Sequence, residues 1–277
     1  MSICSATIHQ QHQRTFLHIL VTGVLLFVLY YLLNSKTEAE SRRVSKISLP
    51  QRERHETAIF NIICFGDSLT EGLTILNGKL DFYPYSKTLQ KLLSRNGNLL
   101  KQAKQNKTIY NVYNEGKSGE RVIGEMTARL PRVLLKETDN SRGSVFDWVI
   151  ILGGTNDLRV AELSGKYEMK RRIYEAIVSL HRVSHRRGAR TVLVTIPGRQ
   201  CELKAKCRQV KMARVYVNKY LRDYTKELGP EKVVLVDLAR KMPFPKMINY
   251  WADEVHFTPA GYNKMAVIIY EALKEHL

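Results

Sequence analysis

Residues 62–72 read IICFGDSLTEG, an apolar run that breaks off at a turn. Residues 58–65 predict a buried strand, because short continuous apolar segments occupy strands that are covered on both faces. Gly66 lets the backbone turn sharply and leaves room beside the following side chains. Ser68 would then lie at the carboxyl edge of a sheet, where open α/β sheets hold their ligands. Ser68 is therefore a candidate nucleophile, although Gly66-Asp67-Ser68 taken alone also fits an ordinary turn.

Apolar and amphipathic segments alternate along the rest of the chain. The expected strands are 58–65, 108–113, 145–152, 190–196 and 232–238. The expected helices are 84–94, 120–136, 167–187, 211–228 and 259–275, the last with Thr258 as its cap and Pro259 at its first position. Residues from Leu69 onward are expected to open a loop. This alternation predicts a mostly parallel five-stranded sheet covered by helices on both faces.

The chain of 277 residues has room for one globular domain of about 200 residues and an appendage. We predict a short tail at 1–15, a transmembrane helix at 16–34, a polar linker at 35–57 and the globular domain at 58–277. Residues 16–33 read FLHILVTGVLLFVLYYLL, carry no formal charge and have about the length that crosses a hydrocarbon core. A cleaved signal peptide is the alternative, although its apolar region usually has about 7–15 residues.

The orientation of this single-pass anchor is predicted from the charges on its two sides. Only Arg14 precedes the apolar segment, whereas six basic residues follow it before residue 55. The positive-inside tendency therefore favours a cytoplasmic globular domain. The sequon Asn106-Lys107-Thr108 points the other way, because it is used only in the lumen.

The formal net charge of +18 bears on the partners of the chain. Such a basic surface is attracted to anionic lipid headgroups, which suits a tethered protein. Nucleic acid is the rival partner, but the basic residues are scattered through helical segments without a recognised binding module. We expect contact with a membrane through the anchor and the basic surface, and no nucleic-acid binding. The oligomeric state is not readable from the sequence.

A hydroxyl nucleophile needs an imidazole base and a group that orients this base. His256 stands in WADEVHFTP, residues 251–259, directly before the last expected helix, and Asp253 precedes it by three residues. One turn of chain brings such a carboxylate to the imidazole. His181 and His185 have helical spacing, but their segment HRVSH lacks the Glu of the hydrolytic zinc motif, so a solvated basic face is favoured.

Two glycine-rich segments after strands offer donors for the oxyanion of a tetrahedral intermediate. Residues 114–119 read NEGKSG and expose a backbone N–H at a glycine. Residues 153–157 read GGTND, and Asn156 can direct its side-chain amide inwards.

The cysteines give no metal site. Cys64 lies in the first apolar run and is expected to be an inert buried thiol. Cys201 and Cys207 share a loop and either form a disulfide or stay reduced, depending on the compartment. A zinc site would require further ligands at metal spacing, and none is nearby.

Four ordered blocks resemble the SGNH hydrolase family, also called GDSL esterases/lipases. They are G-D-S-L at 66–69, S-G at 118–119, G-G-T-N-D at 153–157 and D-x-x-H at 253–256. The resemblance spans roughly Phe60 to the end of the chain. It implies a three-layer, flavodoxin-like α/β/α sandwich that hydrolyses carboxylic esters or thioesters without a metal or cofactor.

The resemblance also implies roles for individual residues. Ser68 is the nucleophile and the first oxyanion donor, through its backbone N–H. Gly119 gives a second backbone N–H and Asn156 a side-chain donor, while His256 is the base and Asp253 its partner. None of these five positions is substituted, so an active enzyme is expected. Asp67 and Asp157 resemble structural members of their blocks.

The substrate stays open at this point. The predicted tether mildly favours a lipid-like ester, whereas the basic loop at 197–211, with Arg199, Lys204, Lys206 and Arg208, equally suits an anionic acyl donor such as a phospholipid or a coenzyme A thioester. Sugar deacetylation is a third possibility. A thioesterase or acyltransferase with the same site, or a non-catalytic membrane-tethered interaction module, are the alternative functions.

Overall fold

The computed structural model describes residues 57–104, 108–135, 146–164, 167–244 and 246–277. All of these residues belong to one compact unit, His55–Leu277. The predicted tail and transmembrane helix lie outside the described residues, as does the predicted linker up to residue 56. Within the described part, no helix combines the length and the apolar character that a bilayer span requires.

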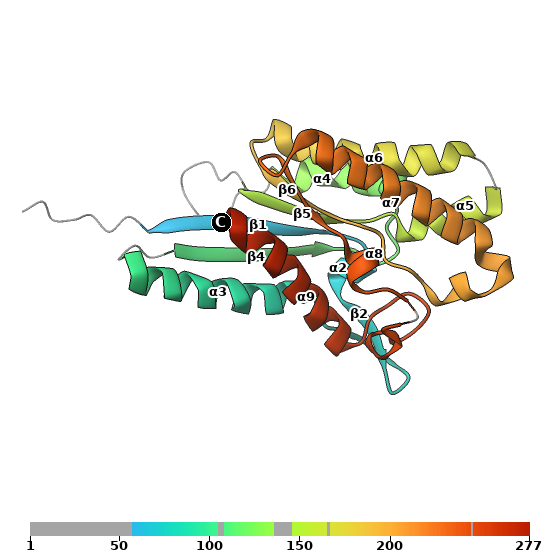
Figure 1. Cartoon of the computed structure of the whole chain (residues 1–277), viewed down its shortest axis with the longest axis horizontal. Helices are drawn as coiled ribbons and strands as arrows, with labels where there is room; N and C mark the ends of the chain where they lie inside the picture. The colour runs from blue at the N-terminus through green and yellow to red at the C-terminus, as the bar shows by residue number, and fades with distance from the viewer. Residues whose placement is uncertain (1–56, 105–107, 136–145, 165–166, 245) are drawn as a thin grey trace, which may run out of the picture. The chain divides into compact units, whose positions relative to one another are not determined.

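Five strands form the central sheet, which is parallel throughout (Figure 1). The strands are β1 Ala58–Gly66, β4 Thr108–Gly116, β5 Trp148–Leu152, β6 Arg190–Val194 and β7 Val233–Val236. Their spatial order is β4-β1-β5-β6-β7, so β1 lies inside the sheet. Numbered along the chain this order is 2-1-3-4-5, the flavodoxin-like order, whose switch point falls between β1 and β5.

Helices cover both faces of the sheet. Ile62 and Cys64 of β1 belong to a core that also contains residues of α3, Tyr85–Lys104, and α9, Pro259–Leu273. Ile63 and Phe65 belong to a second core, formed with the helices α4 Thr127–Val133, α5 Thr155–Ser164, α6 Tyr167–Arg186 and α7 Arg208–Leu228. Successive side chains of a strand point to opposite faces. The apolar run of β1 therefore fills both cores, and the molecule has three layers.

Short elements complete the fold. They are the helices α2 Ser68–Glu71 and α8 Leu238–Lys241, and the single turns η1 Val122–Met126, η2 Gln200–Leu203, η3 Ala205–Cys207, η4 Ile248–Tyr250 and η5 Lys274–His276. All five predicted strands form, with shifted ends. The predicted start of the last helix is confirmed, since the Thr258 hydroxyl accepts a hydrogen bond from Gly261 N–H at 3.2 Å and Pro259 is the first residue of α9.

The loop predicted after Leu69 is wrong, because this segment contains the helix α2 and a hairpin. The hairpin consists of β2 Leu73–Leu76 and β3 Lys79–Phe82, which pair antiparallel. Its two-residue turn, Asn77-Gly78, has φ values of 52° and 74°. This left-handed pair is the turn that matches the twist of two antiparallel strands.

The predicted helix at 120–136 is interrupted. Its first part is the distorted turn η1, in which Gly124 has a φ of 87°, and only α4 is regular. The helix α5 was missed, because the glycines of GGTND indicated a turn. In the structure Thr155, Asn156 and Asp157 form the first turn of α5.

Candidate active site

Ser68 stands where β1 ends, at the first position of α2. Asp67 caps this helix, and one of its carboxylate oxygens accepts a hydrogen bond from Leu69 N–H at 3.0 Å. A Cβ atom at Gly66 would lie 2.3 Å from the carbonyl oxygen of Leu152 on β5. Only glycine permits this close approach of the two strand ends. The turn that carries Ser68 is therefore packed directly against the neighbouring strand.

The structure brings Ser68, His256 and Asp253 together. His256 Nε2 lies 3.0 Å from Ser68 Oγ, although 188 residues separate the two along the chain. On the other side of the ring, Nδ1 lies 2.8 Å from Asp253 Oδ2. The three side chains thus form a continuous hydrogen-bonded row in the order hydroxyl, imidazole and carboxyl. This is the arrangement in which an imidazole can remove the proton of a hydroxyl.

Asp253 is held in its charged form. Burial raises its pKa, but hydrogen bonds from the His256 ring and from the backbone N–H groups of His256 and Val255 outweigh burial and lower the pKa to about 2. Both backbone groups donate to Oδ1 at 2.7 Å, which leaves Oδ2 for the ring. Asp253 is therefore a carboxylate at neutral pH and fixes the orientation of the imidazole.

The loop that carries His256 is closed by contacts between its two ends. Trp251 and Phe257 form an isolated antiparallel bridge, and their ring centroids lie 4.5 Å apart. Within this bridge, Ala252 N–H donates to the carbonyl oxygen of His256 at 2.9 Å. The loop is a closed hairpin-like turn that ends directly at the cap of α9.

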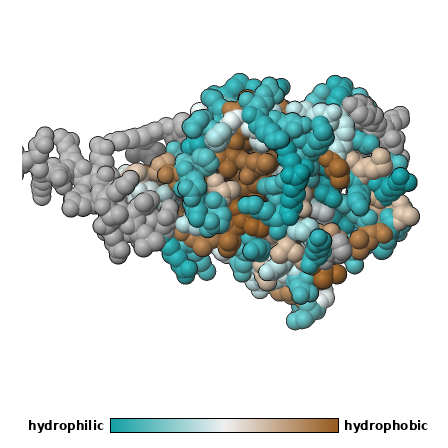
Figure 2. Space-filling view, in the orientation of Figure 1, coloured by the Kyte–Doolittle hydropathy of each residue, from teal (hydrophilic) through white to brown (hydrophobic). Residues whose placement is uncertain are grey.

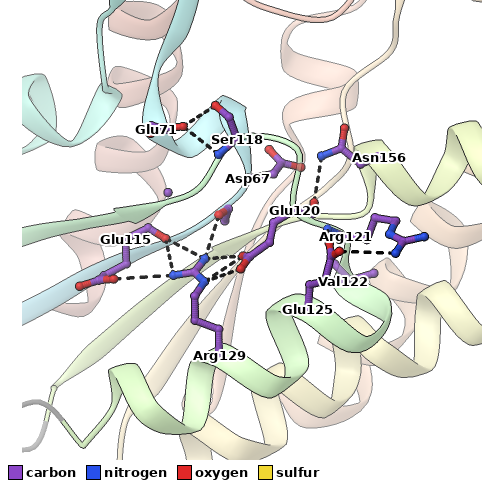
Figure 3. Close-up of polar contacts among 12 residues, drawn as sticks. Asp67, Glu71, Glu115, Ser118, Glu120, Arg121, Val122, Glu125, Arg129 and Asn156 are labelled. Carbon is purple, nitrogen blue, oxygen red and sulfur yellow. Dashed lines mark hydrogen bonds and ion pairs between the residues drawn. The ribbon is translucent and has the colours of Figure 1, made fainter.

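Gly119 lies in an exposed turn after β4, with a φ of 80°. Its two neighbours are both held by side chains (Figure 3). Ser118 donates from its backbone N–H, at 2.8 Å, and from its hydroxyl to the Glu71 carboxylate. The carboxylate of Glu120 is bound by Arg129. Among the described residues, none accepts a hydrogen bond from the backbone N–H of Gly119 or of Ser68.

Asn156 lies against the segment that carries Gly119. Its side-chain amide donates to the carbonyl oxygen of Glu120 at 2.9 Å (Figure 3). The next residue, Asp157, accepts hydrogen bonds from Val122 N–H at 2.8 Å and Ile123 N–H at 3.1 Å. The first turn of α5 and the segment after Gly119 are thus joined by three hydrogen bonds.

An open hollow of about 440 Å³ borders Gly119. It is lined by Lys117, Ser118, Gly119, Glu120, Glu125, Ala128, Arg129 and Arg132. Neither Ser68 nor His256 lines it. The hollow therefore borders the turn of Gly119 and not the Ser68 hydroxyl.

Asp67 is fully buried, and no hydrogen-bond partner is found for its Oδ2 among the described residues. Burial raises its pKa to about 7, with the Asp157 charge adding to the increase and His256 and Arg199 opposing it. The structural role of this carboxyl is the cap of α2, in which its Oδ1 accepts a hydrogen bond from Leu69 N–H. It does not replace Asp253 beside the imidazole.

The basic loop at 197–211 contacts the site through two of the four cations that the sequence suggested, Arg199 and Lys204, but both bind protein groups. Arg199 is buried and donates to the carbonyl oxygen of Thr155 at 2.7 Å. Lys204 forms an exposed ion pair with Glu254 at 3.5 Å. Gln200 N–H donates to the carbonyl oxygen of Glu254 at 2.9 Å, which ties the loop to the turn of His256. Arg199 is thus a structural group.

The predicted solvated face for His181 and His185 is wrong. His181 is fully buried, and burial lowers its pKa to about 3. Both rings meet Thr191 Oγ1, His181 through Nδ1 at 2.8 Å and His185 through Nε2 at 3.0 Å. The pair joins α6 to β6. No group of three or more His, Cys, Asp or Glu side chains suited to a metal occurs in the described part.

Cys201 and Cys207 are both buried and form no disulfide with each other in this structure. Cys64 is buried within β1, and burial raises the pKa of its thiol to about 12. The prediction of an inert buried thiol is confirmed.

Sequence reasoning missed the polar groups that hold the Gly119 turn. Glu71 binds Ser118, and Arg129 binds Glu120. None of Glu71, Glu120 and Arg129 belongs to the four blocks. Glu120 follows the S-G block directly, which was the one available signal. The position of Arg129 on an amphipathic helix gave no indication of what its side chain reaches.

Asp67 gives a pH-dependent prediction. A carboxyl whose pKa is raised on folding adds stability that is fully present below its unfolded pKa, near 4. That stability is lost as the pH rises through the folded pKa of about 7. Asp67→Asn keeps a capping oxygen and removes the charge. We expect its melting temperature, relative to the parent, to be higher at pH 8 than at pH 5.

The matched control is Asp81→Asn, an exposed residue of β3 whose carboxylate accepts from Phe82 N–H. Thermal unfolding of the three proteins at both pH values is the measurement. A gain for Asp67→Asn that is equal at the two pH values, or larger at pH 5, would contradict the raised pKa.

Comparison with known proteins places this geometry in a family. The chain matches the GDSL-like lipase/acylhydrolase family over residues 64–264. No curated protein matches it. Among solved structures, it resembles a lipolytic protein of the G-D-S-L family from Veillonella parvula at 20% identity and a TM-score of 0.53, over 79% of this chain and 100% of the other.

Two further structures are similar at the same coverage, 79% of this chain and 100% of theirs. One is an inhibitor-bound aryl esterase from M. smegmatis, with 18% identity and a TM-score of 0.55. The other is a carbohydrate acetylesterase from Sinorhizobium meliloti, with 16% identity and a TM-score of 0.55. These similarities support the fold, and the family match covers most of the chain. The protein therefore belongs to the GDSL-like lipase/acylhydrolase family and is an ester-hydrolysing enzyme.

Proposed function

We propose that the protein cleaves carboxylic esters through an acyl-enzyme formed on Ser68. The observation that carries this proposal is the row Ser68–His256–Asp253, with distances of 3.0 and 2.8 Å. Ser68 Oγ attacks the ester carbonyl carbon while its proton passes to His256 Nε2. The tetrahedral intermediate then collapses, the bond to the alcohol oxygen breaks, and His256 returns the proton to the leaving alcohol.

Deacylation reverses the same proton path. Water loses a proton to His256 Nε2 and its oxygen attacks the acyl carbon. The bond to Ser68 Oγ breaks, and the proton returns to the serine as the acid leaves. Asp253 stays ionised throughout, because its pKa of about 2 is far below neutral pH. Its charge stabilises the imidazolium that forms in each half of the reaction.

We assign the oxyanion to three donors, namely Ser68 N–H, Gly119 N–H and the Asn156 side-chain amide. Neither backbone N–H has an acceptor among the described residues, so both are free to bind a substrate oxygen. The Asn156 amide uses one hydrogen on the Glu120 carbonyl and retains a second. Donors of this kind stabilise the charge that develops in the transition state.

A lipid-like ester is the substrate class that the surface favours. The hairpin β2–β3 follows α2 directly and turns its apolar face outward. Ile75 and Leu80 are paired across the strands and are 39% and 69% exposed, and Phe82, on the same face, is 49% exposed. Figure 2 shows apolar residues beside hydrophilic ones on the lower projection where Figure 1 places this hairpin. An exposed apolar face of this kind suits contact with a ligand or a membrane.

The predicted membrane anchor belongs to the same proposal. Residues 16–33 are apolar and uncharged, and the net charge of +18 favours anionic lipid. We propose a single-pass anchor with the catalytic domain on the cytoplasmic side. An enzyme tethered in this way would meet its ester substrate at a lipid surface.

The nucleophile is tested with a fluorophosphonate probe. Ser68→Ala is expected to abolish both labelling and ester hydrolysis, because the attacking oxygen is removed. Ser184→Ala is the control, since it removes a buried serine hydroxyl whose one hydrogen-bond partner in the described part of the chain is the carbonyl oxygen of Leu180. Labelling and turnover that persist in Ser68→Ala would disprove the proposed function.

The anchor is tested by extracting membranes with alkaline carbonate. The full chain is expected to stay with the membranes, and the double variant Leu25→Arg, Leu26→Arg to be released, because each central arginine costs about 2.5–3.5 kcal/mol on insertion. Recovery of the parent chain in the soluble fraction would contradict the anchor. Digestion of the catalytic domain by protease outside sealed microsomes is expected, and protection would place it in the lumen instead.

The hairpin is tested by comparing two substrates. Leu80→Asp is expected to lower hydrolysis of a long-chain ester in anionic vesicles about tenfold or more, because burial of one leucine contributes roughly 1.5–3 kcal/mol. Hydrolysis of a soluble acetate ester should not change. Val215→Asp, an exposed position on α7, is the control. Equal losses on both substrates would show that the hairpin does not act at the lipid surface.

A further inference from the structure

Arg129 on α4 makes an unusually complete set of contacts (Figure 3). Its Nε lies 2.7 and 2.9 Å from the two carboxylate oxygens of Glu120, and Nη2 lies 2.6 Å from one of them. Nη1 and Nη2 donate to the carbonyl oxygen of Glu115 at 3.2 Å, and Nη2 also donates to that of Gly66 at 3.2 Å. The guanidinium stacks over the Phe65 ring at 4.2 Å.

These contacts join three separate pieces of the sheet edge. Gly66 ends β1, two residues before Ser68. Glu115 lies at the end of β4. Glu120 directly follows Gly119. The side chains of Arg129 and Glu120 are only 15% and 6% exposed, so their ion pair is largely shielded from water. Such a forked, desolvated pair fixes geometry in a way that a single exposed ion pair does not.

Gly119 has no side chain that could pack against its surroundings and hold its backbone in place. A Cβ atom built on it would meet nothing within 4 Å, and its φ of 80° is one that glycine adopts freely. Its place is set by its neighbours instead. Ser118 is bonded to Glu71 on one side, and Glu120 is bonded to Arg129 on the other.

Asn156 is held in place through the same pair of residues, Glu120 and Arg129. Its amide donates to the backbone carbonyl of Glu120, the residue whose carboxylate Arg129 holds. Each of the three assigned oxyanion donors is therefore within two residues, or one hydrogen bond, of a group bound by Arg129.

We propose that Arg129 is a positioning residue that holds the Ser68 N–H, the Gly119 N–H and the Asn156 amide in register for the oxyanion. This inference rests on the function proposed above and adds to it. Arg129 itself touches no reacting atom. It acts by keeping the donors rigid, and preorganised donors stabilise the transition state more than mobile ones do.

The expected kinetic result is a loss of kcat. Residues that orient a functional group typically contribute about 10–100-fold, as in the outer shells of metal sites. That is less than the roughly 100–1,000-fold cost of deleting a donor, the loss expected for Asn156→Ala. The KM for a small soluble ester should change little, because the donors act mainly on the transition state.

The decisive experiment is chemical rescue of Arg129→Ala in the full chain. Arg129 lines the open hollow of about 440 Å³, so guanidinium ions from solution have access to the vacated site. We expect guanidinium chloride at low millimolar concentration to restore part of the lost kcat, and sodium chloride at the same concentration to restore none. Arg129→Lys should remain impaired, because an ammonium group cannot bind the carboxylate as a fork.

The matched control is Arg121→Ala. Arg121 directly precedes the turn η1, which leads into α4. Its side chain forms an exposed ion pair with Glu125 at 3.4 Å, and its loss should leave kcat unchanged. All values of kcat are taken per active site titrated with the fluorophosphonate probe, so that misfolded protein is not counted.

Two results would overturn the positioning role. One is a kcat per titrated site in Arg129→Ala that equals that of the parent. Arg129 would then contribute to the stability of the fold and not to the rate. The other is equal rescue by sodium chloride and guanidinium chloride. Should Arg129→Ala not fold, Glu120→Gln takes its place, and unchanged kcat in that variant overturns the proposal. A failure of Ser68→Ala to lose activity would instead disprove the underlying function.

Discussion

The parallel direction of the five strands is the constraint on which the site depends. Because every strand runs the same way, the segments that leave their carboxyl ends emerge at one edge. Ser68 follows β1, Gly119 follows β4, and Asn156 follows β5. These three strands are neighbours in the sheet. Groups far apart in the sequence are therefore brought to one place by backbone pairing, before any side chain contributes.

The polar groups at this edge fall into two sets with different roles. Asp253 is partly exposed, heavily hydrogen-bonded and ionised, and it contacts the imidazole directly. Asp67, Arg199 and Arg129 are more buried, and their partners are mainly backbone atoms or other side chains of the framework. Charges of the second kind are costly to bury unless they are paired. Here they determine the positions of turns, whereas Asp253 binds the imidazole ring itself.

The sequence predicted the parts of the fold that local patterns control. Apolar runs such as 58–65 become strands because burial on both faces requires unbroken apolar residues. The spacing of Asp253 and His256 also indicated that their side chains could meet, since a single turn of chain joins them. By contrast, the outward apolar face of β2–β3 depends on how the hairpin packs. Its Asn77-Gly78 turn was a readable hairpin signal that the interpretation of this segment as a loop overlooked.

Other features depended on information that a linear pattern does not contain. Basic neighbours suggested a solvated face for His181, but the rotation of α6 turns that ring towards Thr191 and the core. The helix α5 was hidden because Gly153 and Gly154 indicated a turn, whereas the helix begins at the next residue. The reach of Arg129 to β1, β4 and the Gly119 turn follows from the docking of α4 on the sheet, which no single segment specifies.

The separation of 188 residues between Ser68 and His256 has a consequence for folding. A contact between groups this far apart along the chain forms only when a long loop closes, and closing it costs conformational entropy. The turn of His256 ends directly at the cap of α9. The imidazole is therefore expected to reach the serine hydroxyl only after the sheet has formed and α9 has packed against it.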